Sequence, residues 1–122
     1  MAKELKDRVK PIIIHDKENN RDYTLEFNRE TIKFAEGRGF RIVDVDNFPM
    51  TKVPEFFWYA FRMHHQSVSL AQAEKILDRI GGMSEAMAQR LGELWTAPFE
   101  ALAPDADEDG DEKNATVTVE IL

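Results

Sequence analysis

The stretch 54–66, PEFFWYAFRMHHQ, constrains the fold more than any other part of this sequence. It holds five aromatic side chains and a pair of adjacent histidines within an acidic protein. At about 100° per residue, a helix over 51–66 places apolar or aromatic groups around most of its circumference. Its polar side is left to Glu55, Arg62 and Gln66. A surface helix usually carries an apolar stripe about 100° wide, so this helix must be covered on several sides.

Two interpretations of the helix stay open. In the first, it is the central core element of the protein. In the second, part of its surface stays exposed and binds an apolar helix or strand of another polypeptide. A chain of 122 residues buries only about two thirds of its unfolded surface, which makes complete coverage of so broad an arc difficult. The candidate partner-binding residues are therefore Phe56, Trp58, Tyr59, Phe61 and Met63. Alanine at Trp58 and Phe61 should then abolish binding and leave the fold intact.

The histidine pair does not predict a metal site. Consecutive helical residues point about 100° apart, so His64 and His65 cannot readily bind one ion, and the only other histidine is His15. No carboxylate is expected on the face of His64. We expect His64 in the core with its ring N–H bonded, and His65 at the edge beside Trp58. The sequence predicts neither a metal nor a cofactor.

No catalytic constellation emerges from the sequence. Ser67 and Ser69 lie near the histidines, but Ser69 already suits a helix cap and no motif places an acid behind either histidine. Asp44 and Asp46 lack the glycine and further ligands of a calcium loop. We therefore expect a protein that is not an enzyme.

Size and cysteine content limit the fold to one modest core. The 122 residues correspond to a single domain, and the absence of cysteine excludes disulfides and thiolate zinc sites. No apolar run approaches the roughly 18 residues of a membrane span, and the first ten residues, MAKELKDRVK, lack the apolar block of a secretion signal. These features predict a cytoplasmic protein without a membrane partner.

The net charge of −7 is unevenly distributed. The run 104–113, PDADEDGDEK, holds six acids against one lysine and is expected to be a flexible, solvated segment. Its likeness to a calcium-binding loop is one of composition only. The rest of the chain has no basic stripe that would neutralise phosphates, so nucleic acid is not an expected partner.

Local patterns predict the secondary structure in order. PIIIHD (11–16) and DYTLEF (22–27) flank a turn-rich segment and predict a β-hairpin. Asn28 is a suitable N-cap for a short helix that Gly37 and Gly39 end. Residues 40–50 are expected to be extended, with a third short strand as one option.

The second half of the chain predicts more helices. Thr51 is expected to cap the aromatic helix, whose first turn tolerates Pro54. Ser69 and Gln72 form a capping box before the next helix, and Ser84 caps a last helix that stops near Pro98. NATVTVEIL (114–122) alternates in the manner of a strand.

The expected fold class is α+β. An N-terminal hairpin, with the C-terminal strand as a possible third member, packs on about four helices with the aromatic helix in the centre. The expected organisation is an N-terminal arm 1–10, a single α+β domain 11–103, the acidic flexible segment 104–113 and a strand-like segment 114–122.

Three segments together resemble a known family: DYTLEFNRETIKFAEGRGF (22–40), VPEFFWYAFRMHHQSVSLAQAEKILDRIGG (53–82) and RLGELWTAPFEAL (90–102). They are similar to the small tail assembly chaperones of long-tailed bacteriophages, which include a group catalogued as a domain of unknown function. The similarity covers roughly residues 11 to 103. The matched positions form a pattern of residues that pack in a core, and none of them is catalytic.

The resemblance implies a non-enzymatic protein of the host cell cytoplasm that is absent from the mature virion. Such chaperones bind the long, helical tape measure protein and help the tail tube protein polymerise around it. A second copy of the chain is a further candidate partner. The family often makes a longer product by frameshifting, and the run 104–113 lies where such a linker would begin.

Two other functions fit the sequence. A virion structural component, such as a minor tail or head–tail connector protein, would also be small, acidic and α+β. An inhibitor of a host protein could use the run 104–113 as a mimic of DNA charge.

Overall fold

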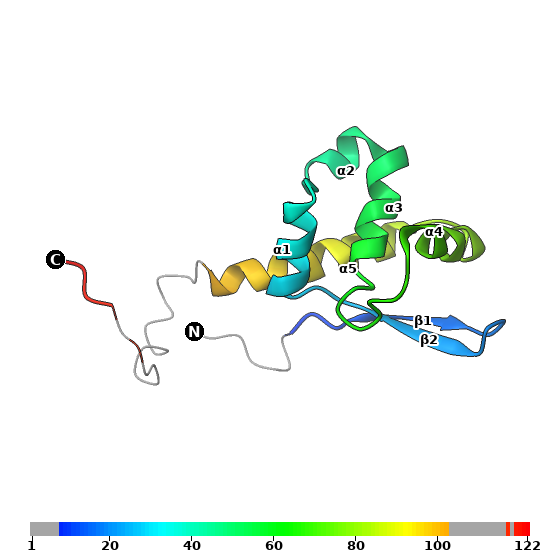
Figure 1. Cartoon of the computed structure of the whole chain (residues 1–122), viewed down its shortest axis with the longest axis horizontal. Coiled ribbons are helices and arrows are strands. Elements are labelled where there is room, and N and C mark those ends of the chain that lie inside the picture. Colours follow the sequence, from blue (N-terminus) through cyan, green and yellow to red (C-terminus); the bar gives the residue numbers. More distant parts are fainter. Residues whose placement is uncertain (1–7, 103–116, 118) are drawn as a thin grey trace.

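The structure, a computed structural model, describes residues 8–102, 117 and 119–122. The fold is α+β, as the sequence predicts: an antiparallel hairpin is followed by helices that cover one of its faces (Figure 1). The acidic run 104–113 lies outside the described residues, and so does most of the N-terminal arm.

The hairpin consists of β1 (Ile12–Asp16) and β2 (Arg21–Leu25). Ile14 lies opposite Tyr23, and Ile12 lies opposite Leu25. Because strand side chains alternate between faces, Ile14, Tyr23 and Leu25 are buried, while the residues between them face solvent or are half-buried. The predicted hairpin is confirmed.

Helix α1 (Arg29–Gly37) starts as the sequence predicts. The Asn28 side chain accepts the backbone N–H of Thr31, and the Thr31 hydroxyl accepts the backbone N–H of Asn28, both at 2.9 Å. This reciprocal pair satisfies two N–H groups that a helix start leaves free. The helix ends before Gly39, whose φ of +88° is a left-handed conformation that suits glycine.

The prediction for residues 40–50 is wrong. They contain the short helix α2 (Asp44–Asn47) and no strand, and α3 (Pro49–Tyr59) follows almost at once. Proline is well suited to the first helical position, because its fixed φ is already helical and its missing N–H is not needed there. The N-cap of α3 is Phe48 and not Thr51, and Pro54 lies inside the helix.

The aromatic helix also ends earlier than predicted, at Tyr59 and not at Gln66. A continuing α-helix would bond the Ala60 carbonyl to the N–H of His64. That carbonyl instead accepts the Glu26 N–H at 2.9 Å, while the His64 N–H bonds to Phe61. The end of β2 thus competes for the Ala60 carbonyl, and residues 60–64 form turns.

Two well-capped helices follow. In α4 (Leu70–Arg79) Ser69 and Gln72 form the predicted capping box, and in α5 (Glu85–Thr96) Ser84 caps the first turn. Gly81 and Gly82, both at positive φ, make the turn between them. The short 3₁₀ helix η2 (Ala97–Ala101) then contains Pro98.

Aromatic side chains form the centre of one hydrophobic core. Phe56 of α3 stacks on Phe27 and on Phe40, with ring centroids 5.5 and 5.9 Å apart, and the edge of Trp95 from α5 meets all three rings. The largest fully buried side chains are Phe40, Phe57, Phe61, Leu25 and Leu91. Helix α3 is therefore the central element, with α1, α5 and the hairpin around it (Figure 1).

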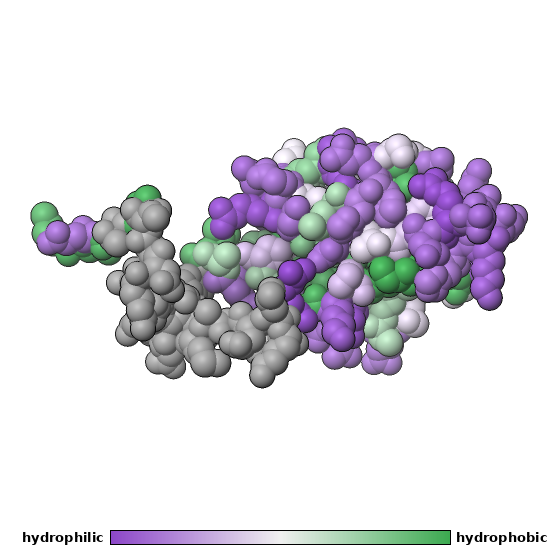
Figure 2. Space-filling model, turned by 90° about the horizontal axis from the view of Figure 1, so that it is seen from below, coloured by the Kyte–Doolittle hydropathy of each residue, from purple (hydrophilic) through white to green (hydrophobic). Residues whose placement is uncertain are grey.

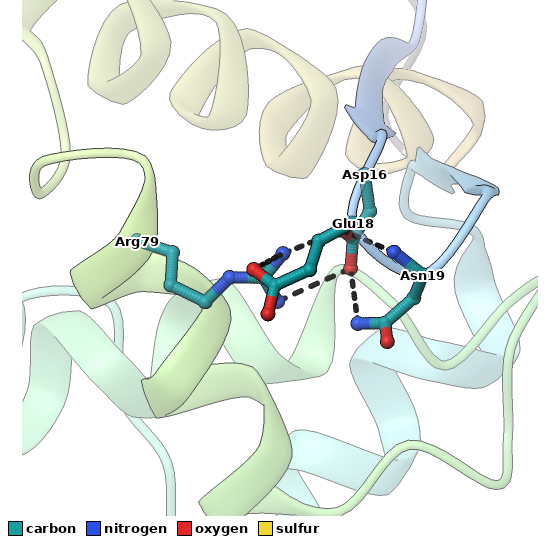
Figure 3. A network of polar contacts seen from close by, with 4 residues as sticks. All are labelled: Asp16, Glu18, Asn19 and Arg79. Carbon is teal, nitrogen blue, oxygen red and sulfur yellow. Dashed lines mark hydrogen bonds and ion pairs between the residues drawn. The ribbon is translucent and has the colours of Figure 1, made fainter.

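An ion pair fixes the hairpin to α4 (Figure 3). The Asp16 side chain, only 3% exposed, accepts hydrogen bonds from the Arg79 guanidinium at 2.5 and 3.2 Å. Asn19 donates both its backbone N–H and its side-chain amide to the same carboxylate. Hydrogen bonds from Arg79, and then from Asn19, hold the pKa of Asp16 well below its usual range.

The described C-terminal residues, 117 and 119–122, belong to no strand. The sheet has two strands, so the predicted option of a C-terminal third strand does not occur among the described residues. None of the described helices combines the length and the apolar character needed to cross a membrane.

Candidate protein-binding surface

Three of the five predicted binding residues lie in the core. Phe56, Tyr59 and Phe61 are buried, and their rings pack edge-on or stacked against core aromatics such as Phe40, Tyr23 and Phe57. A buried side chain cannot form a surface for another polypeptide while the fold is intact. The expectation of an exposed aromatic strip is therefore wrong at these positions.

Trp58 and Met63 are partly exposed, but the two side chains do not belong to one common surface. Trp58 donates its indole N–H to the Val68 carbonyl at 2.9 Å, and the Arg38 guanidinium lies 5.5 Å from its ring centroid. Met63 lies elsewhere, in a shallow groove beside Arg8 and Leu94. The Trp58 side chain is thus held by contacts within the chain, whereas Met63 lines a groove and belongs to a different part of the surface.

The two histidines bind other groups than predicted. His64 is exposed, so the prediction of a core position is wrong. Its Nε2 lies 2.9 Å from a carboxylate oxygen of Glu26, a residue outside the helix segment on which the prediction is based. The Nε2 of His65 accepts the backbone N–H of Thr24 at 2.9 Å. Burial, followed by the charges of His64 and Arg21, lowers the pKa of His65 below its ordinary value.

A metal centre finds no support in the described part of the chain. No group of three or more histidine, aspartate or glutamate side chains there could hold an ion. The buried carboxylate of Asp16 has both oxygens occupied by Arg79 and Asn19. It is therefore suited to holding the hairpin and not to proton transfer.

Four exposed hydrophobic side chains instead lie in and next to α2. We call this surface the apolar corner; it consists of Ile42, Val43, Phe48 and Met50. Phe48 is 60% exposed and Met50 is 91% exposed, although both are large apolar groups. The segment forms the turn between α1 and α3, at the end of the molecule away from the hairpin (Figure 1).

The local structure explains the exposure. Helix α2 has only four residues and no side-chain cap, so it can direct few side chains inward. Val45 packs against the core, and its neighbours in the corner face outward. Because α3 starts directly after Phe48, that side chain is held at the outer side of the bend.

Charged residues alternate with the apolar corner along the chain. Arg41 directly precedes Ile42, Asp44 and Asp46 lie between Val43 and Phe48, and Lys52 pairs with Glu55 at 3.1 Å in α3. An apolar centre with a polar rim is the usual composition of a protein-binding surface. The corner offers contact area and no reactive group, so its chemistry is that of binding.

The sequence carries a local signal for this surface. Asp44 and Asp46 suit the first turn of a helix, and Pro49 suits the first position of the next one. Read as two short helices, residues 43–50 cannot bury all their apolar groups. An extended segment would have placed alternate residues in the core and hidden the corner.

Comparison with known proteins gives one family. Residues 1–121 match the family described as a domain of unknown function (DUF5055). Neither the curated proteins nor the solved structures contain a match to this chain.

Proposed function

The chain belongs to the DUF5055 family, and we propose that it is a tail assembly chaperone of a long-tailed bacteriophage, a non-enzymatic protein that binds the tape measure protein during tail assembly. The apolar corner is the binding surface in this proposal. The segments 22–40, 53–82 and 90–102, which resemble such chaperones, supply the packing of the core that presents it.

The observation that carries the proposal is the exposure of the apolar corner. Small soluble proteins seldom leave four large apolar side chains together in water unless another molecule covers them. Phe48 and Met50 lie on either side of Pro49, at the start of a rigid helix. Methionine adapts its shape to different partners, which suits a client with many similar segments.

The client chemistry follows from the surface. A long helical protein exposes apolar side chains at i, i+3 and i+4 until it is enclosed, and such a stripe can lie against the apolar corner. The net charge of −7 keeps the complex soluble and favours clients with basic flanks. Binding would keep the client from aggregating until tail tube subunits replace the chaperone.

Co-expression with the tape measure protein tests this function. The wild-type chain should keep the client soluble and be recovered with it, whereas a Phe48→Asp/Met50→Asp variant should leave the client insoluble. An Ile13→Asp/Ile80→Asp variant is the matched control, because it also places two negative charges on exposed apolar positions, but on the hairpin side of the molecule. Equal recovery with all three chains would contradict the proposal.

Analysis of purified virions distinguishes the chaperone from a virion structural component. Mass spectrometry should find the protein in infected-cell lysate and not in the finished particles. A fixed copy number per particle would instead identify a minor tail or connector protein.

A further inference from the structure

The outer edge of β1 is unpaired. Within residues 8–102, the backbone of β1 pairs with β2 alone. The other edge of the hairpin is closed, because the Thr24 N–H bonds to His65 and the Glu26 N–H bonds to Ala60. A strand edge with free N–H and C=O groups is a template for a further strand.

Apolar side chains flank this open edge. Ile13 of β1 is 45% exposed, and Ile80, just after α4, is 40% exposed. A groove of about 390 Å³ lies between the two elements and is lined by Ile14, Ile76 and Ile80, with Arg79 and Lys17 among its polar residues. The hairpin face in Figure 2 is mostly hydrophilic, with a hydrophobic area in the middle. The edge thus combines backbone groups with apolar contact area.

The described C-terminal residues have the matching pattern. Val117, Val119 and Ile121 alternate with polar residues, as in a strand with one apolar face. All three are at least 79% exposed, and Figure 2 shows hydrophobic surface on this segment. The apolar face that this alternation would give a strand is therefore not packed against other apolar groups in this structure.

We propose that the C-terminal segment 117–122 of one copy adds as a third strand to the β1 edge of a second copy. Its backbone would bond to the free groups of β1, and Val119 and Ile121 would cover Ile80 and the groove beside it. A three-stranded sheet is also more stable than an isolated hairpin. This self-association goes beyond the proposed chaperone function and uses a different surface.

A second copy is the occupant that the structure favours. In this structure the C-terminus lies at the opposite end of the molecule from the hairpin (Figure 1), and the side chains of Val117, Val119 and Ile121 are exposed and do not pack on their own protomer. Two copies that exchange segments reciprocally form a closed, symmetric dimer, in which both edges and both segments are covered.

Sedimentation equilibrium of the full chain tests the exchange. The wild-type chain should dimerise, and Val119→Asp/Ile121→Asp should raise the dimer dissociation constant at least tenfold. Ile13→Lys/Ile80→Lys, checked for folding by circular dichroism, should do the same. The Phe48→Asp/Met50→Asp variant is the control for the tail variant, because it adds the same two negative charges, and it should dimerise as the wild type does.

Mixing the two defective variants gives the sharpest result. The Val119→Asp/Ile121→Asp chain has an intact β1 edge, and the Ile13→Lys/Ile80→Lys chain has an intact C-terminal segment. A mixture of the two should therefore form a heterodimer in which one C-terminal segment is added to one β1 edge. Mixtures that stay monomeric, a wild-type chain that stays monomeric, or dimers insensitive to the tail variant would overturn the proposal. So would protection of residues 119–122 from hydrogen exchange in a monomer, which would show docking within one chain.

Discussion

The ring Nε2 of His65 accepts the backbone N–H of Thr24 at 2.9 Å and closes the outer edge of β2. The bond requires a neutral ring with an unprotonated Nε2. Forty-one residues separate the two partners, so this contact, together with the bond from Glu26 to Ala60, fixes the turns after α3 to the hairpin.

This contact makes stability depend on pH. Because folding lowers the pKa of His65, the contribution of the neutral ring is complete above the unfolded pKa of about 6.5 and is lost as pH falls through the lower folded value. The free energy of unfolding in urea, measured at pH 7.5 and at pH 5.0, should fall less between the two pH values for His65→Gln than for the wild type. The glutamine amide oxygen can accept the same N–H and does not titrate. His15→Gln is the comparison variant, because it removes an exposed histidine that contacts the Asp22 carboxylate and no backbone N–H. An unchanged pH dependence in His65→Gln would show that the contact does not govern stability.

The ion pair between Arg79 and Asp16 should make folding stability depend on pH in a more acidic range than His65 does. The lowered pKa of Asp16 contributes stability that is complete above the unfolded value of about 4 and is lost as pH falls below it. An Arg79→Met variant should be less stable than the wild type at pH 7, and the difference should shrink between pH 4 and pH 2. Lys75→Met on the exposed side of α4 is a suitable control. A difference that stays constant with pH would contradict this role of the pair.

Two phenylalanines test the division between core and surface. Phe61→Ala should cost about 3–5 kcal/mol of unfolding free energy because the ring is fully buried, whereas Phe48→Ala should change it by less than about 1 kcal/mol. The measurement is chemical denaturation of both variants. The earlier expectation that alanine at Trp58 and Phe61 leaves the fold intact is therefore not compatible with the structure. Equal stability of the two variants would refute the assignment of Phe61 to the core.

Local signals predicted much of the fold. The caps at Asn28, Ser69 and Ser84 depend on side chains within three residues of the helix start, so a short window of sequence contains all the interacting groups. The hairpin likewise follows from alternation and a polar turn. Where the determining contacts are local, sequence reasoning succeeded.

The early end of the aromatic helix has a non-local cause, whereas the helices in 40–50 and the N-cap at Phe48 follow from local signals. The aromatic helix ends at Tyr59 because the Ala60 carbonyl bonds to Glu26, a residue 34 positions away in the sequence that no helical wheel contains. A helix over 51–66 would place Phe61 and Met63 on one apolar surface. Because α3 ends at Tyr59, these two side chains do not form such a surface. The apolar corner escapes an extended interpretation of 40–50, because alternate side chains of an extended segment would be buried, whereas α2 and the start of α3 leave Phe48 and Met50 exposed.

The most direct test is the affinity of the purified chain for the tape measure protein, measured by isothermal titration calorimetry with soluble client fragments. Loss of two central apolar contacts typically costs about 2–4 kcal/mol, so Phe48→Asp/Met50→Asp should weaken binding at least about 30-fold. The Ile13→Asp/Ile80→Asp variant, which carries the same added charge, should bind within about threefold of the wild type. Wild-type affinity in the corner variant, or no binding by any folded chain, would contradict the account.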